Sequence, residues 1–503
     1  MIRTLSKLWI LQPSTRRDRL LLTLPFYGLY LVLLVRHVVW RDEINAWAIS
    51  FVSTNLGDLL HRVHYEAHPA MWYLLLFAGG RITHAVWMLK LIQGLIGTGI
   101  YAYFAWNAPL RRLEYLLILL SYYFTFEYTI LARMYGLEVL FAMIYIRNRI
   151  QHPERVLRNT LWIFLIANVD ITASILAGGL LLEYWASMLS ETTAPRTEFI
   201  RHKILPSFAL FVLAMATCIG TLWPAKDIGW NATGKIFSHF WEAGHLVQAA
   251  IKWIALPWIP MPINIVVSWD TEDWPYFFAM GAIAILLYLI YRPHWKQMIM
   301  VVSMLIAGIF FSHATGVAGV RHTGTIFLAT LLSLWIWRAK GENVSPLLYI
   351  LLIMIAVPGG IAIADQFRAP YTDGDATADW IREHHLEHMM IFGSLDTNML
   401  GVPQRLDLPY YQLNGQVLSR VLTFNRQRDD YDPLTELSPR LIAGMHKEHV
   451  HQALLIDIVA LTRQQQQQLQ HAGFHQQLLV KFDRGFVGDE YSFVYLIQDE
   501  TRP

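Results

Sequence analysis

Two adjacent acidic side chains, Asp42 and Glu43, follow the first long apolar run of the chain, in the stretch WRDEINAW. A carboxylate at this place would serve as a general base toward a hydroxyl group, provided that burial or a negative neighbour raises its pKa from about 4. An isolated acidic pair is more often the solvated start of a loop. The pair therefore indicates chemistry only if other functional groups are expected to converge on it.

A second polar cluster places His64, Glu66 and His68 at alternating positions ahead of Pro69. In an extended segment this alternation puts the three side chains on one side. Three uses stay open: the cluster binds a divalent metal ion, it lines a sugar pocket together with Tyr73, or His68 caps the helix that Pro69 opens. We favour contacts with sugar or protein over the metal ion, and we expect no required cofactor.

Further ionisable side chains fall at the outer turns of the topology described below. They are Arg81, His84, Lys90, Glu127, Arg133, Tyr135, Asp170, Arg321 and His322. Ionisable groups at membrane depth are costly, so each is either a functional candidate or an interfacial anchor. Several cations facing Asp42 and Glu43 suit a phosphate ligand, because paired phosphate oxygens match the planar fork of arginine.

The composition indicates which elements must hold these groups. Of the 503 residues, 55% are hydrophobic and 16% are charged, against roughly 25% charged in soluble proteins. Apolar runs of about 15 to 24 residues recur from Leu20 to Ala364, near the length at which a helix crosses a bilayer. The single cysteine, Cys218, excludes an intramolecular disulfide and a multi-cysteine metal site. The net charge of +2 gives no reason to expect a nucleic-acid partner.

The distribution of Lys and Arg predicts the topology. Residues 1–19 carry five basic side chains against one acid, which places the N-terminus in the cytoplasm. Residues 20–364 then form a transmembrane domain of about 11 helices, provided that the short stretch Ala70 to Gly79 does not cross. The predicted outer loops are residues 41–85 and a large, aromatic-rich loop, residues 224–273. With an odd number of spans, residues 365–503 lie outside the cytoplasmic (inner) membrane.

Two of the apolar runs carry local expectations. Glu114 to Leu131 is predicted to form one helix that ends shortly before Arg133. Leu161 to Met188 is too long for one span and is interrupted by polar residues. We therefore expect two short helices there, with Asp170 at their outer turn.

The tail, residues 365–503, is rich in His, Gln, Asp and Arg and alternates helical with strand-like stretches. The expected helices are Asp373 to His388 and Pro439 to His449, the expected strands are Met389 to Gly393 and Ala453 to Val459, and the expected terminal hairpin joins Gln477 to Asp483 with Tyr491 to Gln498. The pattern predicts a small extracytoplasmic α/β domain.

Four short motifs occur together in this layout: WRDE at Trp40 after the first helix, HP at His68 followed by WYLL, ARMY at Ala132, and Arg321-His322 before a late span. Together they resemble the GT-C superfamily of membrane glycosyltransferases. The nearest group looks like the protein O-mannosyltransferases and aminoarabinose transferases. The resemblance implies a sugar donor linked to polyprenyl or dolichyl phosphate, transfer with inversion, and in general no metal ion.

Carried over residue by residue, the resemblance assigns Asp42 as the catalytic base and Glu43 as its companion acid. It places Arg133 and Arg321 near the donor phosphate. The other cations that we expect near the phosphate are His322, Arg81 and Lys90.

Two positions depart from the family pattern. Ala70 stands where a second proline is usual, and Asp170 stands where a basic residue is common. The residues that we expect to line the substrate pocket are His64, Glu66, His68, Tyr73, Tyr135 and Asp170.

The favoured interpretation is a glycosyltransferase of the cell envelope that moves a sugar from a polyprenyl-phosphate donor in the bilayer to a hydroxyl of a glycan, lipid or protein. One alternative is a transporter or flippase of lipid-linked saccharide, which would place its charges near the bilayer midplane. The candidates here fall at outer turns instead. A second alternative is an enzyme like an O-antigen ligase or polymerase, for which residues 224–273 leave room.

Overall fold

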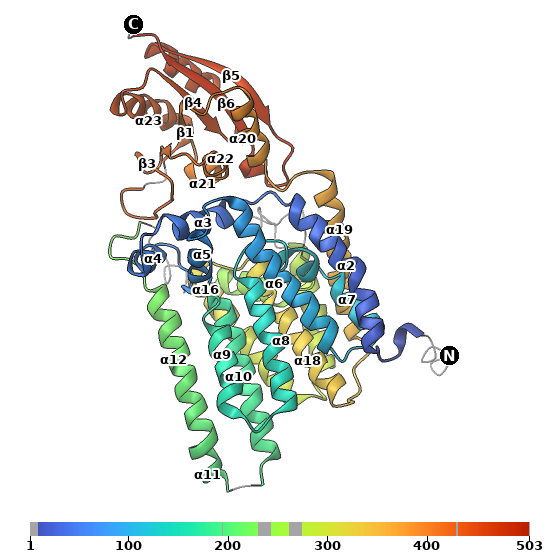
Figure 1. Ribbon diagram of the computed structural model, residues 1–503. Coiled ribbons are helices and arrows are strands. Elements are labelled where there is room, and N and C mark those ends of the chain that lie inside the picture. The colour runs from blue at the N-terminus through green and yellow to red at the C-terminus, as the bar shows by residue number, and fades with distance from the viewer. Residues whose placement is uncertain (1–8, 194, 230–242, 261–273, 429–430, 502–503) are drawn as a thin grey trace.

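The computed structural model describes residues 9–193, 195–229, 243–260, 274–428 and 431–501. A bundle of helices forms the larger part of the molecule, and a unit of helices and strands at the C-terminus forms the smaller part (Figure 1). Three short helices lie where the two parts meet: α3 (Arg41–Val52), α4 (Leu56–Val63) and α5 (Met71–Gly80).

The helices of the bundle follow the apolar runs. They are α2 (Arg16–Arg36), α6 (Val86–Asn107), α7 (Arg112–Leu119), α8 (Tyr135–Gln151), α9 (Val156–Ala167), α10 (Ile171–Glu191), α11 (Arg196–Phe199), α12 (Leu205–Leu222), α14 (Ala243–Ile254), α15 (Trp274–Tyr291), α16 (Trp295–Thr315), α17 (Val320–Thr323), α18 (Thr325–Ala339) and α19 (Leu348–Arg368). Short turns of other helix types are η1 (Trp9–Leu11), η2 (Tyr123–Glu127) and η3 (Ile200–Ile204).

Five helical segments in the described part of the chain are long and apolar enough to cross a membrane. They are Arg16–Arg36, Ile171–Glu191, Arg196–Leu222, Trp295–Thr315 and Leu348–Arg368. Large apolar side chains on their outer faces are exposed, among them Val35 at 76% and Ile306 at 66%. Soluble monomeric proteins rarely expose large contiguous apolar surfaces of this kind. The predicted, mostly helical class is confirmed, and its apolar helices are compatible with a membrane protein.

The C-terminal unit contains a six-stranded sheet in the order β3-β2-β1-β4-β6-β5. The strands are β1 (Met390–Gly393), β2 (Tyr410–Gln412), β3 (Val417–Ser419), β4 (Gln452–Asp457), β5 (Phe474–Phe482) and β6 (Ser492–Asp499). Its helices are α20 (Gly374–Glu383), α21 (Asp396–Met399), α22 (Gly401–Leu406), α23 (Pro433–Lys447), α24 (Arg463–His471) and the short turn η5 (Gly488–Glu490). Strands β2, β1 and β4 are parallel, and β5 pairs antiparallel with β6. The predicted α/β character and terminal hairpin are confirmed.

Two helix predictions need correction. The run from Glu114 to Leu131 is not one helix, because α7 ends at Leu119 and the chain continues through the π-helical turn η2. The hydroxyl of Ser121 donates to the backbone oxygen of Ile118 at 2.6 Å, a local bond that competes with the helical pattern. The run from Leu161 to Met188 does break at Asp170, as expected, but α10 is 21 residues long rather than short.

The two parts of the molecule are joined by backbone pairing near the predicted large outer loop. The N–H of Gly229 donates to the oxygen of Phe424 at 2.7 Å, and the N–H of Arg426 donates to the oxygen of Asp227 at 2.7 Å. The hydroxyl of Tyr65, after α4, donates to the Asp227 carboxylate at 2.6 Å. Three distant segments therefore fix one another at the junction of bundle and sheet.

Candidate active site

A cavity of about 380 Å³ lies at the junction between the bundle and the C-terminal unit. The bundle side contributes Arg41, Asp42, Asn45, Glu66, His68 and Arg133, and the C-terminal side contributes Thr397, Asn398, Leu422, Phe424 and Asp489. The cavity thus collects charged and polar side chains from both parts, as binding sites commonly do.

Helix α3 positions the first acidic motif. Glu43 occupies the third position of the helix, and its carboxylate accepts the backbone N–H of Trp40 at 2.9 Å, which satisfies one of the free donors at the helix start. The same carboxylate contacts Nε2 of His37 at 2.9 Å and accepts the backbone N–H of Ala132. Glu43 is fully buried and does not line the cavity. Its contacts hold the start of α3 in place, so that Asp42 projects toward the cavity.

Asp42 faces two arginines that lie far from it in the sequence. Its Oδ2 is 3.1 Å from the guanidinium of Arg321, and its backbone oxygen accepts a hydrogen bond from Arg133 at 2.7 Å. Burial raises the pKa of Asp42, but the positive charges of Arg321 and Arg133 outweigh it and hold the pKa at about 2. The expected upward shift from burial or an acidic neighbour is therefore wrong for this state, because the arginines dominate.

Arg321 is placed by close packing between α17 and the turn η2. A side chain at Gly324 would overlap the rings of Tyr123 and Tyr128, so glycine permits the approach. The hydroxyl of Tyr128 donates to the backbone oxygen of Arg321 at 3.1 Å. The guanidinium also lies over the ring of Trp40, 5.2 Å from its centroid.

A chain of polar contacts continues from Arg133 into the bundle. Its guanidinium is 2.9 Å from Nε2 of His68, whose Nδ1 is 3.4 Å from Asp170. Burial lowers the pKa of His68, and a neutral imidazole fits both contacts, with Nε2 accepting from Arg133 and Nδ1–H directed at Asp170. Asp170 in turn caps α10, because its carboxylate accepts the N–H of Thr172 at 2.9 Å. The start of α10 thereby orients His68 and Arg133.

Glu66 is the second carboxyl group that lines the cavity. It accepts hydrogen bonds from the amide of Asn45 at 2.9 Å and from the hydroxyl of Tyr73 at 3.2 Å. Burial raises the pKa of Glu66 to about 7. The cavity therefore contains one carboxyl group that is ionised at neutral pH in this state, Asp42, and one whose pKa lies near neutral pH, Glu66.

Two further candidates, His322 and Tyr135, are buried and do not line the cavity. His322 is buried, its Nδ1 accepts the backbone N–H of Gly319 at 3.1 Å, and burial together with Arg321 lowers its pKa to about 3. Tyr135 is buried with its ring 6.3 Å from that of His322, and its hydroxyl has no hydrogen-bond partner among the described residues.

The remaining candidate cations do not reach the cavity. The guanidinium of Arg81 donates to the backbone oxygens of Phe51 and Ser53, each at 2.8 Å, and so caps the C-terminus of α3. The ammonium group of Lys90 donates to the oxygen of Val35 at 3.3 Å, at the end of α2. In this structure both satisfy helix carbonyls and neither lines the cavity, so their assignment to a donor phosphate stays a prediction without support from the geometry.

Of the three residues His64, Glu66 and His68, the latter two line the cavity and His64 does not. The chain turns rather than extends after α4, with Ala67 in the left-handed region at φ 53°. His64 contacts the backbone oxygen of Trp223, outside the cavity. In the part of the chain that the structure describes, no group of three or more His, Cys, Asp or Glu side chains is arranged to hold a metal ion.

Several cavity residues escaped the sequence analysis. Asn45 lies one helical turn after Asp42 and bridges the two parts, since its carbonyl accepts the N–H of Leu422 at 3.2 Å. Arg41 donates from its guanidinium to Asp489 at 2.6 Å and from its backbone to Glu490 at 3.1 Å. Helical spacing from Asp42 would have revealed Asn45, but no local pattern marks the C-terminal residues.

Comparison with known proteins adds no relative. The chain matches no protein-family model, and no curated protein or solved structure matches it. The function therefore has to be argued from the site itself.

Proposed function

We propose that this protein is an inverting glycosyltransferase that moves a sugar from a polyprenyl-phosphate donor to an acceptor hydroxyl. The observation that carries the proposal is the pairing of Asp42 with Arg321 and Arg133 beside a cavity that opens between two parts of the molecule. Arginine forks suit a phosphate group, and a carboxylate between them is suited to take the proton of an attacking hydroxyl.

The low pKa of Asp42 fits this role once the donor is considered. A donor phosphate that binds Arg321 and Arg133 shares the positive charge that now faces Asp42 and adds negative charge beside it. Both changes raise the pKa of the carboxylate from about 2. Asp42 therefore becomes a stronger base when the donor is in place, which limits proton abstraction to the loaded site.

The proposed reaction is a single displacement at C1 of the sugar. The acceptor oxygen bonds to C1 of the sugar as its proton passes to Asp42, and the bond from C1 to the phosphate oxygen breaks on the opposite face. The polyprenyl phosphate leaves with increased negative charge. Arg321 and Arg133 stabilise that charge more strongly in the transition state than in the ground state, as catalysis requires.

The apolar helices supply the place for the long lipid. We assign the bundle to the cytoplasmic membrane as a domain of about 11 spans, with the N-terminus inside and the C-terminal unit outside. In this topology, α5 lies at the interface, and its ten residues are too few to cross. Gln464 on α24 is exposed. We therefore expect a unique cysteine there, in a Cys218→Ala background, to react with an impermeant maleimide in intact or outer-membrane-permeabilised cells. Protection until the membrane is opened would overturn the orientation.

The decisive experiment uses purified protein in liposomes with a panel of radiolabelled polyprenyl-phosphate sugars and crude outer-surface acceptors. We expect polyprenyl phosphate and glycosylated acceptor to appear together, because both arise in one step. If the protein moves the donor between leaflets without cleaving it, the flippase alternative holds. If only diphosphate-linked oligosaccharides are consumed, the alternative resembling an O-antigen ligase or polymerase holds.

A further inference from the structure

The two walls of the cavity differ in charge. The bundle wall carries two guanidinium groups, those of Arg41 and Arg133, together with Asp42 and Glu66. Among the cavity-lining residues that the structure describes, the C-terminal wall contributes no Lys, Arg or His side chain, and its one charged group is Asp489. Because Asp489 is paired with Arg41 at 2.6 Å, the cation left to meet a phosphate ligand is Arg133 on the bundle wall, and the described residues of the C-terminal wall offer such a ligand no cation.

The C-terminal wall is built at an edge of the sheet where ligands commonly bind. Thr397 and Asn398 lie on α21, directly after β1, and Asp489 lies on η5, directly before β6. Because β6 runs antiparallel to β4, its start lies beside the carboxyl end of β4, so both segments meet at the carboxyl edge of the parallel strands. The amide of Asn398 donates to the backbone oxygen of Asp489, which ties α21 to η5.

The aromatic residue Phe424 completes this wall, and contacts with its neighbours fix its position. The guanidinium of Arg428 lies 4.9 Å from the centre of the Phe424 ring and forms a 2.7 Å ion pair with Asp396 of α21. The backbone oxygen of Phe424 accepts the N–H of Gly229. The ring that lines the cavity is thus fixed to both α21 and the outer loop.

The same wall offers hydrogen-bonding groups of both kinds. The Thr397 hydroxyl donates to the amide oxygen of Asn398, which leaves the hydroxyl oxygen as an acceptor and the second amide N–H of Asn398 as a donor for a ligand. Oδ1 of Asp489 has no hydrogen-bond partner among the described residues. A sugar ring presents hydroxyl groups around its rim and an apolar C–H face. We propose that this wall, formed by Thr397, Asn398, Phe424 and Asp489, binds an uncharged sugar ring as the acceptor, with the ring face on Phe424. This inference rests on the proposed transfer reaction and names the class of its acceptor: a neutral glycan rather than a phosphorylated or otherwise anionic one.

The test uses the full-length protein in lipid nanodiscs on an array of neutral oligosaccharides and their phosphorylated or sulfated counterparts. We expect binding to neutral glycans, weakened tenfold or more by Phe424→Ala and by Asn398→Ala. Leu478→Ala, which removes an exposed side chain from the middle of the edge strand β5 and does not touch the cavity lining, is the control and leaves binding unchanged. Thermal unfolding of each variant identifies any that fails to fold. In that case Thr397→Ala, which removes a single hydroxyl from the wall, takes its place.

Binding confined to anionic glycans, binding to no glycan, or neutral-glycan binding that survives both wall substitutions would overturn the inference. Donor cleavage, measured separately as release of polyprenyl phosphate with crude acceptors, tests the transferase itself. Cleavage without neutral-glycan binding refutes the acceptor class alone. Neutral-glycan binding at Phe424 without cleavage of any donor refutes the transferase and leaves the sugar site standing.

Discussion

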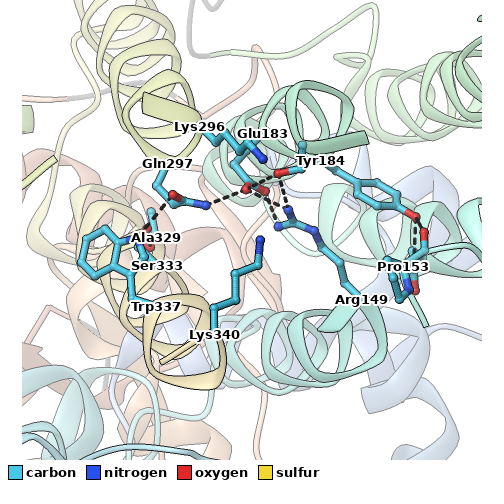
Figure 2. A network of polar contacts seen from close by, with 12 residues as sticks. Arg149, Pro153, Glu183, Tyr184, Lys296, Gln297, Ala329, Ser333, Trp337 and Lys340 are labelled. Carbon is cyan, nitrogen blue, oxygen red and sulfur yellow. Dashed lines mark hydrogen bonds and ion pairs between the residues drawn. The ribbon is translucent and has the colours of Figure 1, made fainter. Parts of the chain in front are cut away.

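The molecule contains two buried clusters of charge that look alike in composition but differ in what surrounds them. In one, Asp42 faces Arg321 and Arg133 beside a cavity. In the other, shown in Figure 2, Glu183 on α10 pairs with Arg149 on α8, and the same carboxylate accepts the amide of Gln297 on α16 at 2.7 Å. Both clusters join helices that are distant in the sequence.

The second cluster is closed. One oxygen of Glu183 accepts hydrogen bonds from Arg149 at 2.8 Å, from Ser187 at 3.0 Å and from Gln297, and Gln297 in turn accepts the indole N–H of Trp337 at 3.3 Å. These contacts of Glu183 all lead to other side chains of the bundle (Figure 2). This cluster fastens α8, α10, α16 and α18 together. Burial and ionic pairing alone therefore do not mark a site, whereas pairing beside open space does.

The largest expected effect separates the clusters by activity. Asp42→Asn keeps the shape of the side chain but cannot take a proton, so transfer falls by about 10² to 10⁴. The thermal unfolding temperature stays close to that of the wild type, because the cavity lets the neighbouring arginines relax. Polyprenyl phosphate release and thermal unfolding measure the two quantities. Undiminished turnover in folded protein would remove Asp42 from the reaction.

A substitution in the closed cluster is expected to lower stability and to leave activity unchanged. Arg149→Met leaves Glu183 buried without its cation, and we expect a loss of about 3–5 kcal/mol in the free energy of unfolding. Activity per folded molecule stays at the wild-type level. In the double variant with Glu183→Met, most of the lost stability returns, because no uncompensated charge remains. Equal stability of the single and double variants would show that the unpaired charge of Glu183 does not cause the loss of stability.

A smaller effect distinguishes the geometry of the arginine from its charge. Arg321→Lys keeps the charge but loses the planar fork, so we expect transfer to fall by roughly 10-fold, and further for Arg321→Ala. Arg338→Lys is a matched control, since Nε of Arg338 donates to both oxygens of Glu114 at 3.0 and 3.1 Å and Nη2 donates to the same carboxylate, away from the cavity. Equal losses of activity in both lysine variants would mean that the fork at Arg321 has no special role.

A pH-dependent effect is expected from Glu66 in the open cluster. Because the pKa of Glu66 is raised from 4.5 to about 7, the folded state binds a proton that the unfolded state has lost between these values. Stability therefore falls as the pH rises through this window. Glu66→Gln removes this contribution, so its unfolding temperature should decline less than that of the wild type between pH 5 and pH 8. Exposed Glu154→Gln is the control. Parallel profiles of wild type and Glu66→Gln would contradict the assigned shift.

The smallest expected effect is the response to chelation. His64, Glu66 and His68 contact three separate partners, so we expect transfer to continue at an unchanged rate after exhaustive treatment with EDTA. Loss of activity that a divalent metal ion restores would reverse this expectation.

Much of the fold could be predicted because its signals are local. Apolar runs located most helices of the bundle, and the strand-like stretches near Met390 and Gln452 lie where β1 and β4 are found. The break at Asp170 was readable because a short polar side chain suits a helix start. The π-helical turn after α7 was not readable, since Tyr122 to Glu127 are as apolar and aromatic as the helix before them.

The site could be predicted only on the bundle side. Asp42, Arg133 and Arg321 stand in short motifs next to predicted spans, and the structure brings them together. Arg81 and Lys90 fall at the same predicted level, but sequence cannot tell a cation that caps a helix from one that faces a cavity. Phe424 and Asp489 depend on how the sheet docks on α3, which no sequence pattern records.

The contact between Arg41 and Asp489 joins residues 448 positions apart. At the usual synthesis rate of about 5–20 residues per second, the second partner is made roughly 20 to 90 s after the first. During this interval a nascent chain already carries the acid and the arginines but lacks the far wall of the cavity. The cavity is therefore enclosed only after the last strand of the sheet has been made, so any activity that needs both walls begins only with the completed chain.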